Sequence, residues 1–419
     1  CLAWFYLIQH NWTRIETLCS PDLSASSKKM GFTELIEKWG FDCVNTRFLG
    51  ADTIEYWQRF RLYPKEFSEL KLTSYKAIIK QIGGEYEKRP LFSPFSAILN
   101  IFLYETTHIE FPERMYLIFA LYASINSILF FYLLRLIKLK FLTALLLTGI
   151  ITVSFGWISV FSIPESYSLS VLGAIITLIS GIHINNLTGN RIYPGILVHC
   201  LLTGIASWLY LPISGAVFII VGCKNKIKYP LLVFTIAISA VCLIAITPQL
   251  VLNSKNLSSQ YNYGQRWGSI GNLIDVKIWF DILCSYLIFS IIAPVSNFMN
   301  SSGNVDWSEI FARPGAIFSY ISIAFSYFFL LREAIRRRLK AVIAGQMIWL
   351  ILLLIWNVFF NPETILLYLS VPLCVIFFII ASIIEKLDTL PHYTKKINIF
   401  LLFILVILLV FNSRAVFLA

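Results

Sequence analysis

Long apolar runs, separated by short polar or basic turns, limit what this chain can fold into. Hydrophobic residues make up 58% of its 419 residues, charged residues make up 14%, and the mean hydropathy is +0.74. Soluble globular domains carry about 25% charged residues, so the composition predicts an all-α polytopic membrane protein. The net charge of +11 fits Lys and Arg in cytoplasmic turns, where they set the orientation of membrane helices, and nucleic-acid binding is not expected.

The apolar runs predict a bundle of about 11–12 transmembrane helices. The opening stretch CLAWFYLI is shorter than the about 20 apolar residues that cross a bilayer, so we interpret residues 1–9 as the tail of a first transmembrane helix. A lipid anchor on Cys1 is less favoured, because apolar residues follow at once. The later segments are expected at 115–137, 141–162, 167–184, 194–210, 213–222, 229–246, 278–293, 316–331, 341–360, 364–384 and 397–411.

Basic turns predict the orientation. If the Lys and Arg residues near 135–140, 191, 224–228, 332–340 and 386–396 face the cytoplasm, the long polar loop before them lies outside. The segment at 278–293 connects two polar stretches that should both be outside, so we expect it to lie along the membrane surface or to be re-entrant. The predicted divisions are an external loop domain with amphipathic or interfacial helices at 10–114, a transmembrane module at 115–248, an external region at 249–314 and C-terminal transmembrane helices at 315–419.

Acidic residues lie next to the external ends of several predicted helices. Asp52 and Glu55 fall in the first loop, Glu165 follows SVFSIP, and Glu363 follows FFNP. Ionisable residues at the membrane boundary are costly and often functional. We therefore expect these carboxylates to converge in one external cavity, where a carboxylate within hydrogen-bond reach of a hydroxyl can act as a general base.

The order of the polar motifs resembles that of membrane glycosyltransferases of the GT-C class. The first loop contains FLGADTIEYWQRFRLYPKEF and then GEYEKRPLFSPF, and the chain continues with IPESYSLS and later FNPETILLYLSVP. GADTIEY is similar to the GD-x-x-x-Y context of that class, and RPLFSPF is similar to the segment that turns from its first loop into an interfacial helix. The acidic motif differs from the adjacent DD or DE of the clearest families.

The resemblance implies an enzyme that moves a sugar from a polyprenyl-phosphate donor to an acceptor on the external face of the membrane. It implies that Asp52 is the catalytic base and that Glu165 is a second catalytic residue. Cations would hold the charge of the leaving polyprenyl phosphate. The substrate-binding candidates are Glu55, Arg89, Arg266, Arg313, Glu363 and Tyr368.

These candidates also have structural interpretations. Asp52 can cap the helix that follows it, and Glu165 can stabilise a helix N-terminus. Pro362 is an ordinary helix start next to Glu363, and an isolated external arginine such as Arg266 is often an interfacial anchor.

No metal site is predicted, because His10 and His108 lack partners at ligand spacing; the sequence leaves a divalent metal cofactor open. The eight cysteines show no ligand spacing either. Cys19 and Cys43 could form a disulfide if the first loop faces an oxidising compartment.

Two other functions stay open. The lack of an adjacent acidic pair favours a catalytically silent GT-C-like subunit of a larger membrane complex. A lipid-linked-sugar transporter should carry charged residues within its spans and show repeat symmetry, and neither is evident. The expected partners are the polyprenyl-phosphate-linked sugar, an acceptor, membrane lipids and membrane protein subunits. The expected location is a bacterial inner membrane with the first loop outside.

Overall fold

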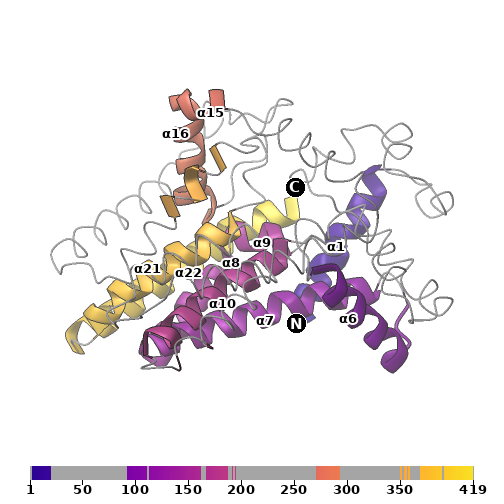
Figure 1. Ribbon diagram of the computed structural model, residues 1–419, viewed down its shortest axis with the longest axis horizontal. Helices are drawn as coiled ribbons and strands as arrows, with labels where there is room; N and C mark the ends of the chain where they lie inside the picture. Colours follow the sequence, from indigo (N-terminus) through magenta and orange to yellow (C-terminus); the bar gives the residue numbers. More distant parts are fainter. Residues whose placement is uncertain are drawn as a thin grey trace.

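Helices make up nearly all of the chain that the structure describes. A computed structural model (Figure 1) describes residues 2–19, 92–110, 113–161, 167–186, 191, 194, 270–292, 350–351, 353–355, 357–358, 369–388 and 391–418. Within these ranges 92% of the residues are helical and no strand occurs. The prediction of an all-α chain is therefore confirmed for this part of the protein.

Helix α7 (Glu113–Leu136) runs along the described bundle and closely matches the apolar run predicted at 115–137. Its 24 residues rise about 36 Å at 1.5 Å per residue, which exceeds the about 30 Å hydrocarbon core of a bilayer. The helix contains neither Pro nor Gly, and its buried face includes Phe119, Phe130 and Leu134. By length and composition, α7 could cross a membrane.

Helix α22 (Pro391–Leu418) contains the second such segment of the described chain, at Tyr393–Asn412. It includes the run predicted at 397–411, and it begins at a proline, whose missing N–H costs nothing in a first helical turn. Only 11% of its apolar window is buried. Large apolar side chains such as Ile399 and Phe403 are therefore exposed along it.

The run predicted as one span at 141–162 is instead two helices. Helices α8 (Phe141–Val153) and α9 (Phe155–Phe161) meet at Ser154 with a bend of 62°. Ser154 has extended backbone angles (φ −69°, ψ 145°), and its hydroxyl donates to the Ile150 carbonyl at 2.7 Å. Such local side-chain bonds compete with the helix ladder, and an apolar pattern does not reveal them. The bent pair is a third candidate span if its two halves cross together.

Helix α1 (Leu2–Cys19) continues well past residue 9, where the first helix was expected to end. Its first half packs on α7 and α9. The ring of Phe5 meets Tyr116 edge-on with centroids 5.8 Å apart, and Trp4 lies 6.0 Å from Phe161. The polar residues that follow have moderate helix propensities, so they continue a helix that the packed apolar half has already begun.

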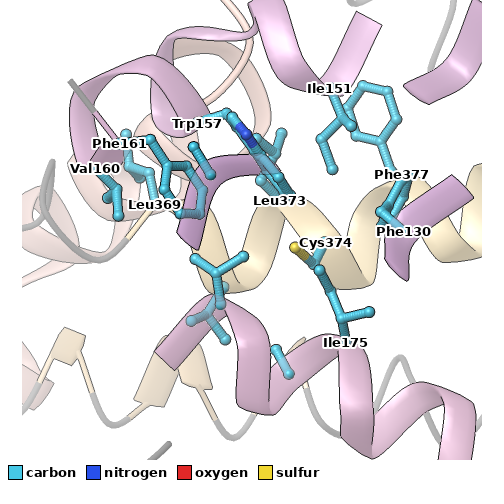
Figure 2. Packing of buried hydrophobic residues seen from close by; sticks show 14 of the residues in the cluster. Phe130, Ile151, Trp157, Val160, Phe161, Ile175, Leu369, Leu373, Cys374 and Phe377 are labelled. Carbon is cyan, nitrogen blue, oxygen red and sulfur yellow. The ribbon is translucent and has the colours of Figure 1, made fainter. Parts of the chain in front are cut away.

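Helices α10 (Tyr167–Asn186) and α21 (Ser370–Asp388) complete the core. They confirm the helix predicted at 167–184 and the described part of the one at 364–384. Figure 2 shows Cys374 of α21 close to Ile175 of α10. Both side chains are fully buried, so Cys374 is a small core residue.

An aromatic group joins α7 to α9 in the same core. The Trp157 ring lies 6.3 Å from Phe130 and 4.9 Å from Phe161, measured between centroids. All three rings are fully buried. Tilted and edge-on pairs of this kind are worth about 0.5–1.5 kcal/mol beyond their buried area, so they help hold the bent pair against α7.

The predicted surface or re-entrant segment at 278–293 falls on two short elements, α16 (Val276–Cys284) and the π-helical η4 (Ser285–Phe289), and the short helix α15 (Ile270–Ile274) precedes them. Asp275 caps α16 by accepting from the Lys277 amide at 2.8 Å. The nine residues of α16 and five of η4 fall short of the about 20 needed to cross a bilayer. The position of this segment relative to a membrane stays a prediction.

Helices α8 and α22 run side by side in the same direction. At one end, Lys140 Nζ donates to Thr394 Oγ1 at 2.6 Å, and Thr143 Oγ1 donates to Asn398 Oδ1 at 2.9 Å. At the other end, Asn412 Nδ2 donates to the Val153 carbonyl at 2.6 Å. The bundle therefore has two distinct ends, one where α7 turns into α8 and one where α8 breaks.

Candidate functional site

All predicted site residues lie outside the described residues, so their convergence and their roles stay predictions. They are Asp52, Glu55, Arg89, Glu165, Arg266, Arg313, Glu363 and Tyr368. The structure does describe residues that flank several of them. We therefore build the candidate site from these flanking residues and from the polar groups around them.

The segment that carries Glu165 lies between two helix ends, and each of these ends contacts another helix of the bundle. Asn126 of α7 donates from Nδ2 to the Ser168 carbonyl at 3.3 Å, close to the start of α10, and to the Tyr122 carbonyl at 2.8 Å. On the other side, Phe161 at the end of α9 contacts Trp4. The described residues on both sides of the segment 162–166 therefore belong to packed helices of the bundle.

The segment that carries Glu363 and Tyr368 leads into Leu369, which is fully buried. A Cβ placed on Gly156 would lie 3.1 Å from the Ser290 carbonyl oxygen and 3.2 Å from Leu369 Cβ. Only glycine fits this approach without a shift of its neighbours, and Figure 2 shows Leu369 beside Trp157 and Phe161. The flanks of 162–166 and 361–368 therefore meet in one part of the bundle.

Hydrogen bonds hold the break between α8 and α9 at this same place. The first amides of a helix have no helical partners, and here the amides of Phe155 and Gly156 donate to the carbonyls of Ile291 and Ser290 at 3.1 and 2.8 Å. Asn412 Nδ2 also donates to the Ile291 carbonyl, at 2.8 Å. We call Ser154–Gly156, Ser290, Ile291 and Asn412 the joint.

Three buried polar atoms on helices around the joint have no hydrogen-bond partner within the described chain: Asn126 Oδ1, Trp157 Nε1 and Ser370 Oγ. They come from α7, α9 and α21, and all three side chains are fully buried. An unsatisfied buried polar group costs about 1–3 kcal/mol, so such groups are rare and often mark a functional or hydrated position. We call these three residues the polar layer.

A buried arginine fixes the helix that follows the first loop. Helix α6 (Phe92–Thr107) begins soon after Arg89, and Arg114 in the first turn of α7 is only 2% exposed. Its Nε donates to Asn100 Oδ1 at 2.5 Å, its Nη1 donates to the Ile109 carbonyl at 2.8 Å, and its guanidinium lies 5.0 Å from the Tyr104 ring centroid.

We call Asn100, Tyr104, Ile109 and Arg114 the clamp. A buried charge is costly unless it is paired and hydrogen-bonded. The clamp supplies two hydrogen bonds and a cation–π contact, and the Glu110 carboxylate adds electrostatic attraction. Between α6 and α7 the chain reverses at His108, whose positive φ of 52° lies in the left-handed region. The clamp therefore sets how the first loop joins the bundle.

Metal ligands do not gather in the described chain, where no group of three His, Cys, Asp or Glu side chains could hold an ion. The described part of the site thus offers hydrogen-bonding groups and aromatic surface. The carboxylates of the predicted chemistry all belong to the remaining residues.

The clamp and the joint were missed by reasoning from the sequence. An arginine at the start of an apolar run was a usable signal for the clamp, because charged residues at the ends of spans are seldom placed without a partner. Asn412, directly after the apolar run 397–411, was a comparable signal for the joint. Nothing in the local sequence pointed to the Ser290 and Ile291 carbonyls.

Comparison of the chain with models of protein families, with curated proteins and with solved structures gave no match.

Proposed function

We propose that this chain is an integral membrane glycosyltransferase of the GT-C type, which transfers a sugar from a polyprenyl-phosphate donor. The supporting observation is that residues flanking the segments 162–166 and 361–368 lie close together at the joint. Leu369, which follows Tyr368, lies against Gly156 of α9, the helix that ends at Phe161 just before the segment with Glu165. A pocket at this position would take its carboxylates from both segments and further hydrogen bonds from the polar layer.

The distribution of charge supports an orientation for this enzyme. Arg135, Lys138, Lys140, Lys395 and Lys396 lie at the end where α7 turns into α8 and where α22 begins, and all five are exposed. If this end faces the cytoplasm, the joint faces the opposite side, together with the loop that carries Asp52. The site would then act on the external face of a bacterial inner membrane.

The proposed chemistry assigns one residue to each of three roles: removal of the acceptor proton, stabilisation of the leaving phosphate and orientation of the sugar. The Asp52 carboxylate takes the proton of the acceptor hydroxyl, whose oxygen attacks the anomeric carbon as the bond to the polyprenyl phosphate breaks. Arg89 holds the charge of the leaving phosphate, while Glu165 orients the sugar. The exposed apolar surface of the helices is suited to the isoprenoid tail.

The test is sugar transfer by the purified full chain in lipid nanodiscs. Polyprenyl-phosphate-linked hexoses labelled with tritium in the sugar serve as donors, and a membrane extract supplies acceptors. We expect Asp52→Asn to slow transfer about 10²–10⁴-fold, as is typical for loss of a general base. Glu69→Gln, from the same loop, is the matched control and should retain most of the rate. Full activity of Asp52→Asn would remove the proposed base.

A second measurement separates the enzyme from a silent subunit. A photoreactive polyprenyl phosphate, without sugar, reports whether the chain binds the lipid. Labelling of a wild-type chain that transfers no sugar from any donor would favour the silent subunit, while absence of both labelling and transfer would contradict both functions.

A further inference from the structure

Exposed cations from two distant parts of the sequence meet at the end of the bundle opposite the joint. Arg135 lies in the last turn of α7, Lys138 and Lys140 lie in the turn between α7 and α8, and Lys395 and Lys396 lie in the first turns of α22. The bond from Lys140 Nζ to Thr394 Oγ1 brings the two segments into contact. We call these five residues the basic rim.

The charges of the rim are all positive. No Asp or Glu occurs at 135–153 or at 391–412, the segments that carry the rim and the helices behind it. The nearest acidic residues in sequence, Glu385 and Asp388, lie on α21, where Lys386 offsets one of them. The rim therefore presents a net positive surface, which suits an anionic partner.

Exposed apolar side chains continue directly from the rim along α8 and α22. Phe141 and Leu142 are 62% and 51% exposed, and Ile399 and Phe403 are 60% and 54% exposed. Tyr393, 47% exposed, lies at the level of the cations, where tyrosine is enriched in membrane proteins because its ring is amphipathic. Charge at the end and apolar surface beside it match the two parts of a phospholipid.

We propose that the basic rim binds the headgroup of an anionic phospholipid, whose acyl chains lie along the exposed faces of α8 and α22. A soluble anion would gain nothing from the apolar faces, and a second copy of this chain facing the rim would bring like charges together. The inference rests on the proposal that the chain spans a membrane, and it is independent of sugar transfer.

Native mass spectrometry of the full chain, released from detergent micelles, can count bound lipids. The probes are phosphatidylglycerol, phosphatidylcholine and glycerol 3-phosphate. We expect wild type to bind phosphatidylglycerol more tightly than phosphatidylcholine, and Lys140→Gln/Lys395→Gln/Lys396→Gln to weaken phosphatidylglycerol binding about fivefold per lysine removed, since each cation near an anionic lipid surface contributes on this order. Phosphatidylcholine binding should not change.

Three controls make the result specific. Lys277→Gln neutralises an exposed lysine on α16, away from the rim in sequence and element, and should leave phosphatidylglycerol binding unchanged. The triple Lys→Arg variant keeps the charge and should bind as wild type does. Glycerol 3-phosphate should bind far more weakly than the lipid, because it lacks acyl chains.

The outcomes separate the lipid site from the membrane proposal on which it rests. Equal phosphatidylglycerol binding by wild type and the triple Gln variant, equal loss in Lys277→Gln, or equal binding of glycerol 3-phosphate would overturn the rim as a lipid site. Failure of the wild-type chain to insert into phosphatidylcholine vesicles would instead overturn the membrane proposal itself.

Discussion

The two ends of α7 carry arginines that are used in opposite ways. Arg114 at its start is buried and held by Asn100, Ile109 and Tyr104. Arg135 at its end is exposed, and its Nη1 donates to the Leu139 carbonyl of the next turn. A buried charge with its own hydrogen-bond partners fixes one helix against another. Exposed charges instead create an electrostatic field that attracts an anionic partner outside the protein.

The largest expected effect tests this difference directly. Arg114→Leu removes the buried charge and the hydrogen bonds that it donates to Asn100 Oδ1 and to the Ile109 carbonyl, so we expect a loss of about 3 kcal/mol in the free energy of unfolding. Arg135→Leu on the same helix removes one bond at an exposed site and should cost less than about 1 kcal/mol. Unfolding by titration with SDS in mixed micelles, followed by tryptophan fluorescence, measures both.

Arg114→Lys sharpens this comparison, because it keeps the charge but cannot reproduce the forked geometry of the guanidinium. Its cost should fall between those of the two leucine variants. Equal costs for Arg114→Leu and Arg135→Leu would mean that the clamp contributes no more than a surface arginine.

Two glycines of the bent pair offer the next comparison. A Cβ at position 156 would lie 3.1 Å from the Ser290 carbonyl oxygen, whereas at Gly149 its nearest neighbour is the flexible end of Leu405, at 3.3 Å. We expect Gly156→Ala to destabilise the protein by about 1–3 kcal/mol through overpacking. Gly149→Ala should be near neutral. The small shift required of the Leu405 side chain is offset by the helix propensity of alanine, which exceeds that of glycine by up to about 1 kcal/mol. The same SDS titration decides between them, and similar costs would mean that the backbones at the joint readily move apart.

The apolar runs and their lengths were enough to predict the helices α7 and α10 nearly to their ends. The same signal failed at Ser154, because the break depends on carbonyls supplied by Ser290 and Ile291 and on the small size of Gly156. Contacts between residues so far apart in sequence leave no local pattern. The extension of α1 to Cys19 was missed for a related reason, since its packed first half sustains a polar second half.

Candidate site residues were chosen from the sequence because carboxylates and arginines at helix ends are chemically capable. That reasoning cannot tell which helix ends meet in space. The contacts of Asn126 with Ser168 and of Gly156 with Leu369 supply this information for the flanks of two segments. The polar layer could not be predicted, because Asn, Trp and Ser within apolar runs are ordinary residues until their partners are known.

Asn412 should contribute less than the clamp but more than any single contact at the rim. Its amide donates to the carbonyls of Val153 and Ile291, so Asn412→Leu removes both bonds, although the Ile291 carbonyl still accepts from the Phe155 amide. We expect a loss of about 1–2 kcal/mol in the free energy of unfolding. Hydrogen exchange of the α9 amides should also speed up, because the joint loosens. Unchanged exchange together with full stability would show that the Phe155 and Gly156 amides hold the joint without Asn412.

The smallest effect is expected where α8 meets α22 at the rim. Thr143 Oγ1 donates to Asn398 Oδ1 at 2.9 Å between the two helices, whereas Thr148 Oγ1 donates only within α8, to the Ala144 carbonyl. Hydrogen bonds between helices in membranes average about 0.6 kcal/mol, so Thr143→Val should cost about that much and Thr148→Val less. A double-mutant cycle of Thr143→Val with Asn398→Leu isolates the pair. A coupling as large as the effect of Asn412→Leu would mean that the rim is held as firmly as the joint, and the contrast between a fixed end and a lipid-binding end would then fail.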